Sequence, residues 1–137
     1  MKNMLILGLW LLIPHFSQSQ TKNYKVVFDL TSKDTSDQKN VIRWVNEISK
    51  ADADAKLEVV LYGQSLNLIV KNKSAYPDQM TKLLANKNVS FRVCAIAMKA
   101  HNIEKSQLFP GVETVPDGIY EIITKQREGW GYIKVSH

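Results

Sequence analysis

The chain contains a single cysteine, Cys94, at the point where an alternating apolar run gives way to a helical pattern. The run "VSFRV" has the β-branched and aromatic residues of a strand, and "MKAHNI" follows with helical character. A thiol at the start of a helix lies near partial positive charge, which favours the nucleophilic thiolate. The opposite interpretation stays open, because unpaired cysteine is among the most frequently buried residue types.

Three neighbouring residues are candidates to support Cys94. Arg92 shares a face with Cys94 if the strand continues that far, because side chains alternate along a strand. If the helix already includes Cys94, then Met98 and His101 lie on the same helical face, and His101 is a candidate base two turns away. Asp29 stands late in an apolar strand, where we expect a structural role.

Several common chemistries have no signature in this sequence. It has no phosphate-binding glycine loop, no paired-cysteine or histidine-rich metal spacing and no nucleophile-elbow pattern. We therefore expect neither a cofactor nor a metal site. The net charge of +5 comes from lysines and arginines that are scattered among acidic residues. This distribution predicts a solvated surface and no nucleic-acid partner, because nucleic-acid binding needs a basic patch or stripe.

The N-terminal residues predict export. Lys2 precedes the apolar run "MLILGLWLLI", which Pro14 ends, and the small residues of "SQSQ" allow cleavage after Ser19. We expect a signal peptide over residues 1–19 and a single domain over residues 20–137 in the periplasm, with no membrane contact after cleavage. An uncleaved N-terminal anchor is the alternative. With one cysteine, the domain has no internal disulfide.

Strand-like and helix-like segments alternate through the domain. The expected strands are 24–30, 57–63, 89–97, a short piece within 111–118 and 130–135. The expected helices include one after a Thr35–Gln38 capping box, with Val41, Ile42, Val45 and Ile48 on its apolar face, one capped by Ser65, one beginning at Pro77, and one over 119–129 with Gly129 at its end. This alternation predicts a doubly wound α/β fold: a mostly parallel, five-stranded sheet with helices on both faces.

In such sheets, ligands bind beyond the carboxyl ends of the strands. Cys94, the loop after Leu30 and the Gly63–Asn67 turn follow three different strands, so we expect them to meet at one rim. Gly63, Ser65 and Asn67 would then contribute hydrogen-bonding groups to a pocket beside Cys94.

Four segments carry a family resemblance: "VVLYGQSLNLIV", "FRVCAIAMKAHNI", "PGVETVPDGIYEI" and "QREGWGYIKV". With them, the chain from Tyr24 to Val135 resembles the DsrE/DsrF-like family of sulfur-relay proteins. The resemblance implies a doubly wound domain that forms homo-oligomers, often trimers or hexamers. It also implies that Cys94 carries sulfur as a persulfide and passes it to the thiol of a partner protein.

Three functional hypotheses follow. The first is a sulfur carrier, or sulfurtransferase-like protein, with Cys94 as the persulfide acceptor. The second is a non-catalytic oligomeric module that binds a small ligand or a protein, with Cys94 as a structural residue. The third is a scaffold whose apolar surface serves assembly alone.

Overall fold

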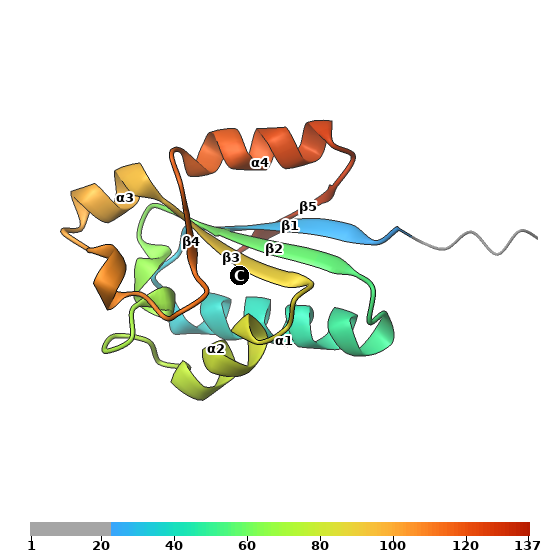
Figure 1. Ribbon diagram of the computed structural model, residues 1–137, viewed down its shortest axis with the longest axis horizontal. Coiled ribbons are helices and arrows are strands. Elements are labelled where there is room, and N and C mark those ends of the chain that lie inside the picture. Colours follow the sequence, from blue (N-terminus) through green and yellow to red (C-terminus); the bar gives the residue numbers. More distant parts are fainter. Residues whose placement is uncertain (1–22) are drawn as a thin grey trace, which may run out of the picture.

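A computed structural model describes residues 23–137, so the predicted signal peptide lies outside the described residues. The fold is α/β, as predicted, with one five-stranded sheet in which every strand pair is parallel. Figure 1 shows helices on both sides of this sheet. In chain order the elements are β1 (Lys25–Leu30), α1 (Thr35–Ala51), β2 (Lys56–Leu61), the 3-10 helix η1 (Ser65–Ile69), α2 (Pro77–Leu84), β3 (Val89–Cys94), α3 (Ala95–Ala100), the 3-10 helix η2 (Lys105–Gln107), β4 (Glu113–Val115), α4 (Gly118–Arg127) and β5 (Gly131–Val135).

The strand order is β4-β3-β2-β1-β5. The chain therefore adds β2, β3 and β4 in one direction and then returns across the sheet to place β5 beside β1. Crossovers between parallel strands are right-handed, so a reversal of direction moves the connecting helix to the opposite face. This rule accounts for α1 and α2 on one face and α4 on the other, whereas α3 lies at the end of the sheet (Figure 1).

The face beneath α1 and α2 is the main hydrophobic core. Alternate strand residues fill it: Val26, Phe28 and Leu30 from β1, Leu57, Val59 and Leu61 from β2, and Val89, Phe91 and Val93 from β3. The expected apolar face of α1 packs here, and the ring of Trp44 stacks on Phe28 with centroids 6.5 Å apart. Burial of this face supplies the main driving force for folding.

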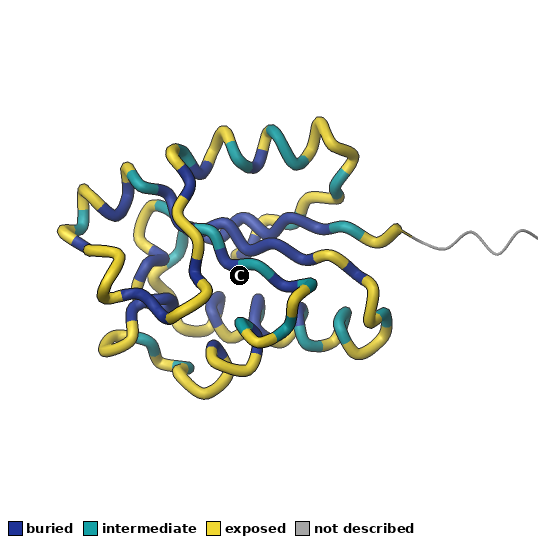
Figure 2. Tube along the Cα trace, viewed as in Figure 1, coloured by how far each residue is buried: buried dark blue, intermediate teal, exposed yellow. Residues whose placement is uncertain are grey.

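The face beneath α4 has a different composition. Its buried apolar cluster consists of Val27, Val60 and Ile122, with Tyr62 and Trp130 packed against it. The remaining side chains on this face are mainly polar or charged, including Asp29, Glu58 and Arg92. Figure 2 shows that much of α4 stays exposed or half-buried, in contrast to the buried strands. Strand β1 is buried on both faces, and Asp29 is its buried charged residue on the face beneath α4.

The start of α1 differs from the predicted capping box. Thr35 is already the first helical residue, and Gln38 is buried within the helix. The N-cap is Asp34, whose carboxylate accepts hydrogen bonds from the Ser36 backbone N–H at 2.7 Å and from its hydroxyl at 2.8 Å. These bonds keep the pKa of the Asp34 carboxyl below its usual range. The prediction was wrong because two adjacent capping residue types, Asp34 and Thr35, compete for the same position.

Replacing Asp34 with alanine should reduce the free energy of unfolding, because the first turn of α1 loses the carboxylate that accepts from the Ser36 backbone N–H. Urea denaturation at pH 7 would measure the change. Asp54→Ala is the matched control, because it also removes an exposed aspartate, here one outside the helices. Equal stability of the two variants would contradict the capping role.

Two further sequence predictions need correction. Ser65 is the first residue of η1 and does not cap it; its buried hydroxyl shares its single proton between the carbonyl oxygens of Leu30, at 2.8 Å, and Tyr62, at 2.9 Å. The third strand ends at Cys94, earlier than expected. The prediction for Pro77 is confirmed, because α2 begins there, and Gly129 follows α4 with a φ of 82°. Among the described helices, none has the length and apolar character needed to cross a bilayer.

Candidate functional site

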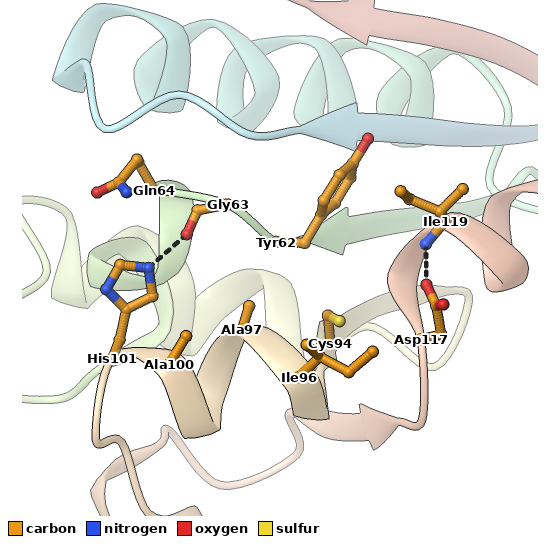
Figure 3. A pocket seen from close by; sticks show the side chains of 10 residues that line it. All are labelled: Tyr62, Gly63, Gln64, Cys94, Ile96, Ala97, Ala100, His101, Asp117 and Ile119. Atoms are coloured by element: carbon orange, nitrogen blue, oxygen red, sulfur yellow. Dashed lines mark hydrogen bonds between the residues drawn. The ribbon is translucent and has the colours of Figure 1, made fainter.

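Cys94 is the last residue of β3 and the N-cap residue of α3. It lies at the carboxyl edge of the sheet, where parallel α/β folds place their binding sites. The residue is 6% exposed, and it lines a cavity of about 390 Å³. Figure 3 shows its sulfur in the space between Tyr62 and Ile119. The thiol is therefore largely covered and yet adjoins an open volume.

Three segments form the walls of this cavity (the Cys94 cavity). One wall is the turn after β2, one is α3, and the third is the start of α4. The lining residues are Tyr62, Gly63, Gln64, Cys94, Ile96, Ala97, Ala100, His101, Asp117 and Ile119 (Figure 3). Most of these side chains are apolar or uncharged, and none is a lysine or arginine.

The start of α4 lies very close to Cys94. Asp117 caps this helix, with its carboxylate accepting from the backbone N–H groups of Ile119 at 2.8 Å and Tyr120 at 3.3 Å. At Gly118 an added Cβ would lie 3.2 Å from the Cβ of Cys94, 3.3 Å from Cγ1 of Val60 and 3.4 Å from the Cβ of Tyr62. Such contacts are tighter than side chains normally make, so glycine is what allows this approach.

His101 lines the same cavity but lies at its far end. Cys94 and His101 cap opposite ends of α3, and seven residues of helical rise separate them by roughly 10 Å. The Nε2 atom of His101 lies 2.6 Å from the carbonyl oxygen of Gly63 (Figure 3). Because a carbonyl only accepts, Nε2 carries a proton and donates it in this bond. In this arrangement His101 joins α3 to the β2 turn and is too distant to act as a base for Cys94.

The other predicted site residues lie outside the Cys94 cavity, except Gly63, which lines it. The hydroxyl of Ser65 is hydrogen-bonded to backbone carbonyl oxygens and does not face this cavity. Asn67 lines a smaller, neighbouring cavity. Met98 is buried, with its sulfur 3.9 Å from the hydroxyl of Thr114.

Arg92 shares the α4 face with Cys94, but its guanidinium is turned into a cluster of charges beneath α4. It lies 3.2 Å from Glu58, 3.3 Å from Glu113 and 3.4 Å from Glu121. Lys125 completes the cluster, 3.6 Å from Glu58 and 3.7 Å from both Glu121 and Glu128. Arg92 therefore positions α4 on the sheet and does not contact the cavity.

Glu58 is the most buried member of this charge cluster, and its Oε1 atom has no hydrogen-bond partner among the described residues. Burial, followed by its interaction with the Glu121 carboxyl, raises the pKa of Glu58 to about 7. The surrounding charges also favour a bound proton, because the cluster contains four carboxylates and only two cations, Arg92 and Lys125.

Asp29 forms a second polar network on the same face. Its carboxylate accepts from the hydroxyl of Tyr132 at 2.6 Å and from Nζ of Lys134 at 3.1 Å. The hydrogen bond to Asp29, helped by burial, raises the pKa of Tyr132 to about 12. Burial, with the nearby Asp29 carboxyl, also raises the pKa of Tyr62. These interactions agree with the structural role expected for Asp29.

The sequence reasoning did not identify Tyr62, Gln64, Ile96, Asp117 or Ile119 as site residues. The "PDG" turn held a usable signal, because an aspartate before a helix is a typical N-cap. No local pattern indicated that the start of α4 lies against Cys94. This contact depends on the order of the strands in the sheet, which places β4 beside β3. Within residues 23–137, no three His, Cys, Asp or Glu side chains are grouped as a metal site.

Comparison with solved structures identifies the same fold in other proteins, among them the following three. A protein of unknown function, MTH1491 from Methanobacterium thermoautotrophicum, is 29% identical with a TM-score of 0.76, covering 81% of this chain and 98% of that chain. The ychN protein from E. coli is 14% identical with a TM-score of 0.67, covering 82% and 98% respectively. A conserved protein of unknown function, BT1422 from Bacteroides thetaiotaomicron, is 16% identical with a TM-score of 0.68, covering 85% and 99%. The last two likenesses show the fold alone.

No curated protein sequence matches the chain. The family model of the DsrE/DsrF-like family, however, matches residues 25–135, which span all five strands and the Cys94 cavity. The resemblance inferred from the sequence is thereby confirmed, and the chain belongs to the DsrE/DsrF-like family.

Proposed function

We propose that the protein is a sulfur carrier that accepts sulfur on Cys94 as a persulfide. The observation that carries this proposal is the placement of the only thiol of the chain against a cavity at the carboxyl edge of the sheet. Membership in a sulfur-relay-type family supports the same chemistry.

The transfer is a thiol–disulfide type of exchange with no net oxidation. The Cys94 thiolate attacks the outer sulfur of a donor persulfide, R–S–SH, and a new S–S bond forms as the donor S–S bond breaks. The donor leaves as the thiolate R–S⁻, and Cys94 becomes Cys–S–SH. An acceptor thiolate then removes the outer sulfur and restores the Cys94 thiolate. With no second cysteine in the chain, an intramolecular disulfide does not compete.

Incubation with an alkyl persulfide should add the mass of one sulfur atom to each wild-type chain. Cys94→Ser should abolish this addition, because the variant keeps the shape of the side chain and lacks the nucleophilic sulfur. Intact-protein mass spectrometry under non-reducing conditions would measure it, and a thiol reductant should remove the added mass. A wild-type chain that takes up no sulfur, and whose thiol resists alkylation until unfolding, would refute the proposal.

The apolar cavity also suits the second hypothesis, a binding module in which Cys94 forms part of the wall. The Cys94→Ala variant distinguishes the sulfur carrier from the binding module. A module would keep ligand binding and stability nearly unchanged in this variant, whereas a sulfur carrier loses its activity.

The homo-oligomer implied by the family resemblance is part of the proposal. Large apolar side chains at the rim of the Cys94 cavity and along α4 support it: Ile96, Ile119, Tyr120 and Ile123 are each at least 40% exposed. Clustered exposed apolar residues are typical of protein interfaces.

A further inference from the structure

A second, smaller cavity (the lysine cavity) lies on the other side of a wall that it shares with the Cys94 cavity. It has a volume of about 130 Å³, and its lining is mainly polar. Five polar side chains line it, those of Lys33, Gln64, Asn67, Lys73 and His101, and no lining residue is acidic. Cys94 does not belong to its lining, so any ligand held there is separate from the thiol.

The two lysines come from segments that are far apart in the sequence. Lys33 lies in the loop after β1, and Lys73 lies in the turn after η1. Neither lysine forms an ion pair with another described residue. The carboxylate of Asp34, next to Lys33 in the chain, accepts from the backbone N–H and hydroxyl of Ser36. Two cations therefore line one concave site without a described counter-charge, and a bound anion would relieve their mutual repulsion.

The other three polar side chains have unused hydrogen-bonding groups. The side-chain amides of Gln64 and Asn67 have no hydrogen-bond partner among the described residues, and Figure 3 shows the Gln64 amide directed away from Cys94. His101 donates from Nε2 to the carbonyl of Gly63, which leaves Nδ1 without a described partner. Amide NH₂ groups donate to anionic oxygens, and Nδ1 accepts a proton from a hydrogen phosphate or, when protonated, donates one.

From these features we infer that the lysine cavity binds a tetrahedral oxyanion, either free phosphate or the phosphate group of a small metabolite. The cavity has room for several water molecules, and a phosphate group can take their place. Lys33 and Lys73 neutralise the charge of this group, while Gln64 and Asn67 donate hydrogen bonds to its oxygens. A metal cation is disfavoured at the same place, because it would meet two positive charges and no carboxylate.

Titration with sodium phosphate, followed by ¹H–¹⁵N NMR of the labelled protein, tests this inference. The side-chain signals of Gln64, Asn67 and His101 should shift saturably, with half-saturation on the order of 1 mM, as expected for a few partly exposed charged contacts. Sodium chloride at the same ionic strength should not reproduce these shifts, because general screening needs no site. Glycerol 3-phosphate should shift the same signals. Tighter binding of this ester would identify a metabolite as the source of the phosphate group, and weaker binding would identify the free anion.

The Lys33→Gln, Lys73→Gln double variant should weaken phosphate binding about ten-fold, because both charged contacts are lost. Lys82→Gln with Lys87→Gln is the matched control, since it removes the same charge from exposed lysines outside both cavities. Cys94→Ser should bind phosphate as the wild type does, whatever the result of the sulfur-loading experiment. Shifts no larger than those caused by sodium chloride, or binding that is unchanged in the first double variant, would overturn the inference.

Discussion

Replacing Glu58 with glutamine should stabilise the protein at pH 8 by about 2–3 kcal/mol, although the change removes two ion-pair contacts. Glu58 is buried beneath α4, and its pKa is raised to about 7 from an ordinary value of 4.5. At pH 8 the folded protein therefore contains a carboxylate that would be better solvated in the unfolded chain. Glutamine mimics the neutral carboxyl and avoids this cost, while Arg92 keeps its contacts with Glu113 and Glu121.

The sign of the pH dependence follows from proton binding. Below pH 4.5 Glu58 is protonated in both states and contributes no penalty. Between pH 4.5 and about 7 the folded state holds a proton that the unfolded state has lost, so the free energy of unfolding falls as pH rises. The penalty becomes complete and constant at about pH 8, where the folded state has also lost this proton. The advantage of Glu58→Gln should thus be absent at pH 4 and full at pH 8.

Urea denaturation of wild type and variant at both pH values would measure this difference. Glu128→Gln is the control, because this carboxylate belongs to the same charge cluster but its side chain is 53% exposed. Its effect should stay within about 0.5 kcal/mol at either pH. A Glu58→Gln variant less stable than wild type at pH 8 would show that the carboxylate is stabilised by Arg92 and Lys125.

Replacing Gly118 with alanine should lower the free energy of unfolding by about 2 kcal/mol and speed the alkylation of Cys94. The new Cβ would lie 3.2 Å from the Cβ of Cys94 and 3.3 Å from Cγ1 of Val60, and both of these residues are buried. The start of α4 must therefore shift outward. Since α4 contributes only Ile122 to the buried cluster of its face, the helix is the element that gives way, and the cavity widens around the thiol.

Gly131→Ala is the matched control for this variant. A Cβ at Gly131 would make only ordinary contacts, the nearest at 3.5 Å, and its φ is not positive. Iodoacetamide kinetics followed by mass spectrometry, together with urea denaturation, would compare the two. If Gly118→Ala matches Gly131→Ala in both stability and alkylation rate, the close approach of α4 to Cys94 limits neither the stability of the fold nor access to the thiol.

Much of the site's framework could be predicted from the sequence. Alternating residues in "VSFRVC" placed Cys94 late in a strand, and the change to helical spacing placed it before a helix. Gly63 indicated the turn after β2, with a φ of 61° that favours glycine. These signals are local, so each one is readable from a few neighbouring residues.

The roles of individual polar residues were harder to predict. The hydroxyl of Ser65 was expected near the site, but it binds the carbonyl of Leu30, a residue 35 positions earlier. Arg92 was expected beside Cys94, and its guanidinium instead meets Glu121, 29 positions later. A long polar side chain takes whichever partner the fold brings near, and this depends on contacts between distant segments.

The sequence alone determined which residues share a face of the sheet, because side chains alternate along each strand regardless of what covers them. It predicted that Arg92 and Cys94 share a face if the strand extends to Cys94, and β3 does end at this residue. Helices on both faces were predicted as well, but only the tertiary structure decided that α4 is the helix that covers this polar face. The return of β5 to the side of β1 carries α4 across it, buries Glu58 and brings Gly118 against Cys94. The start of α4 forms the third wall of the Cys94 cavity, and its position depends on the order of the strands in the sheet. Strand order depends on pairing between distant segments, so it cannot be deduced from any short stretch of the sequence.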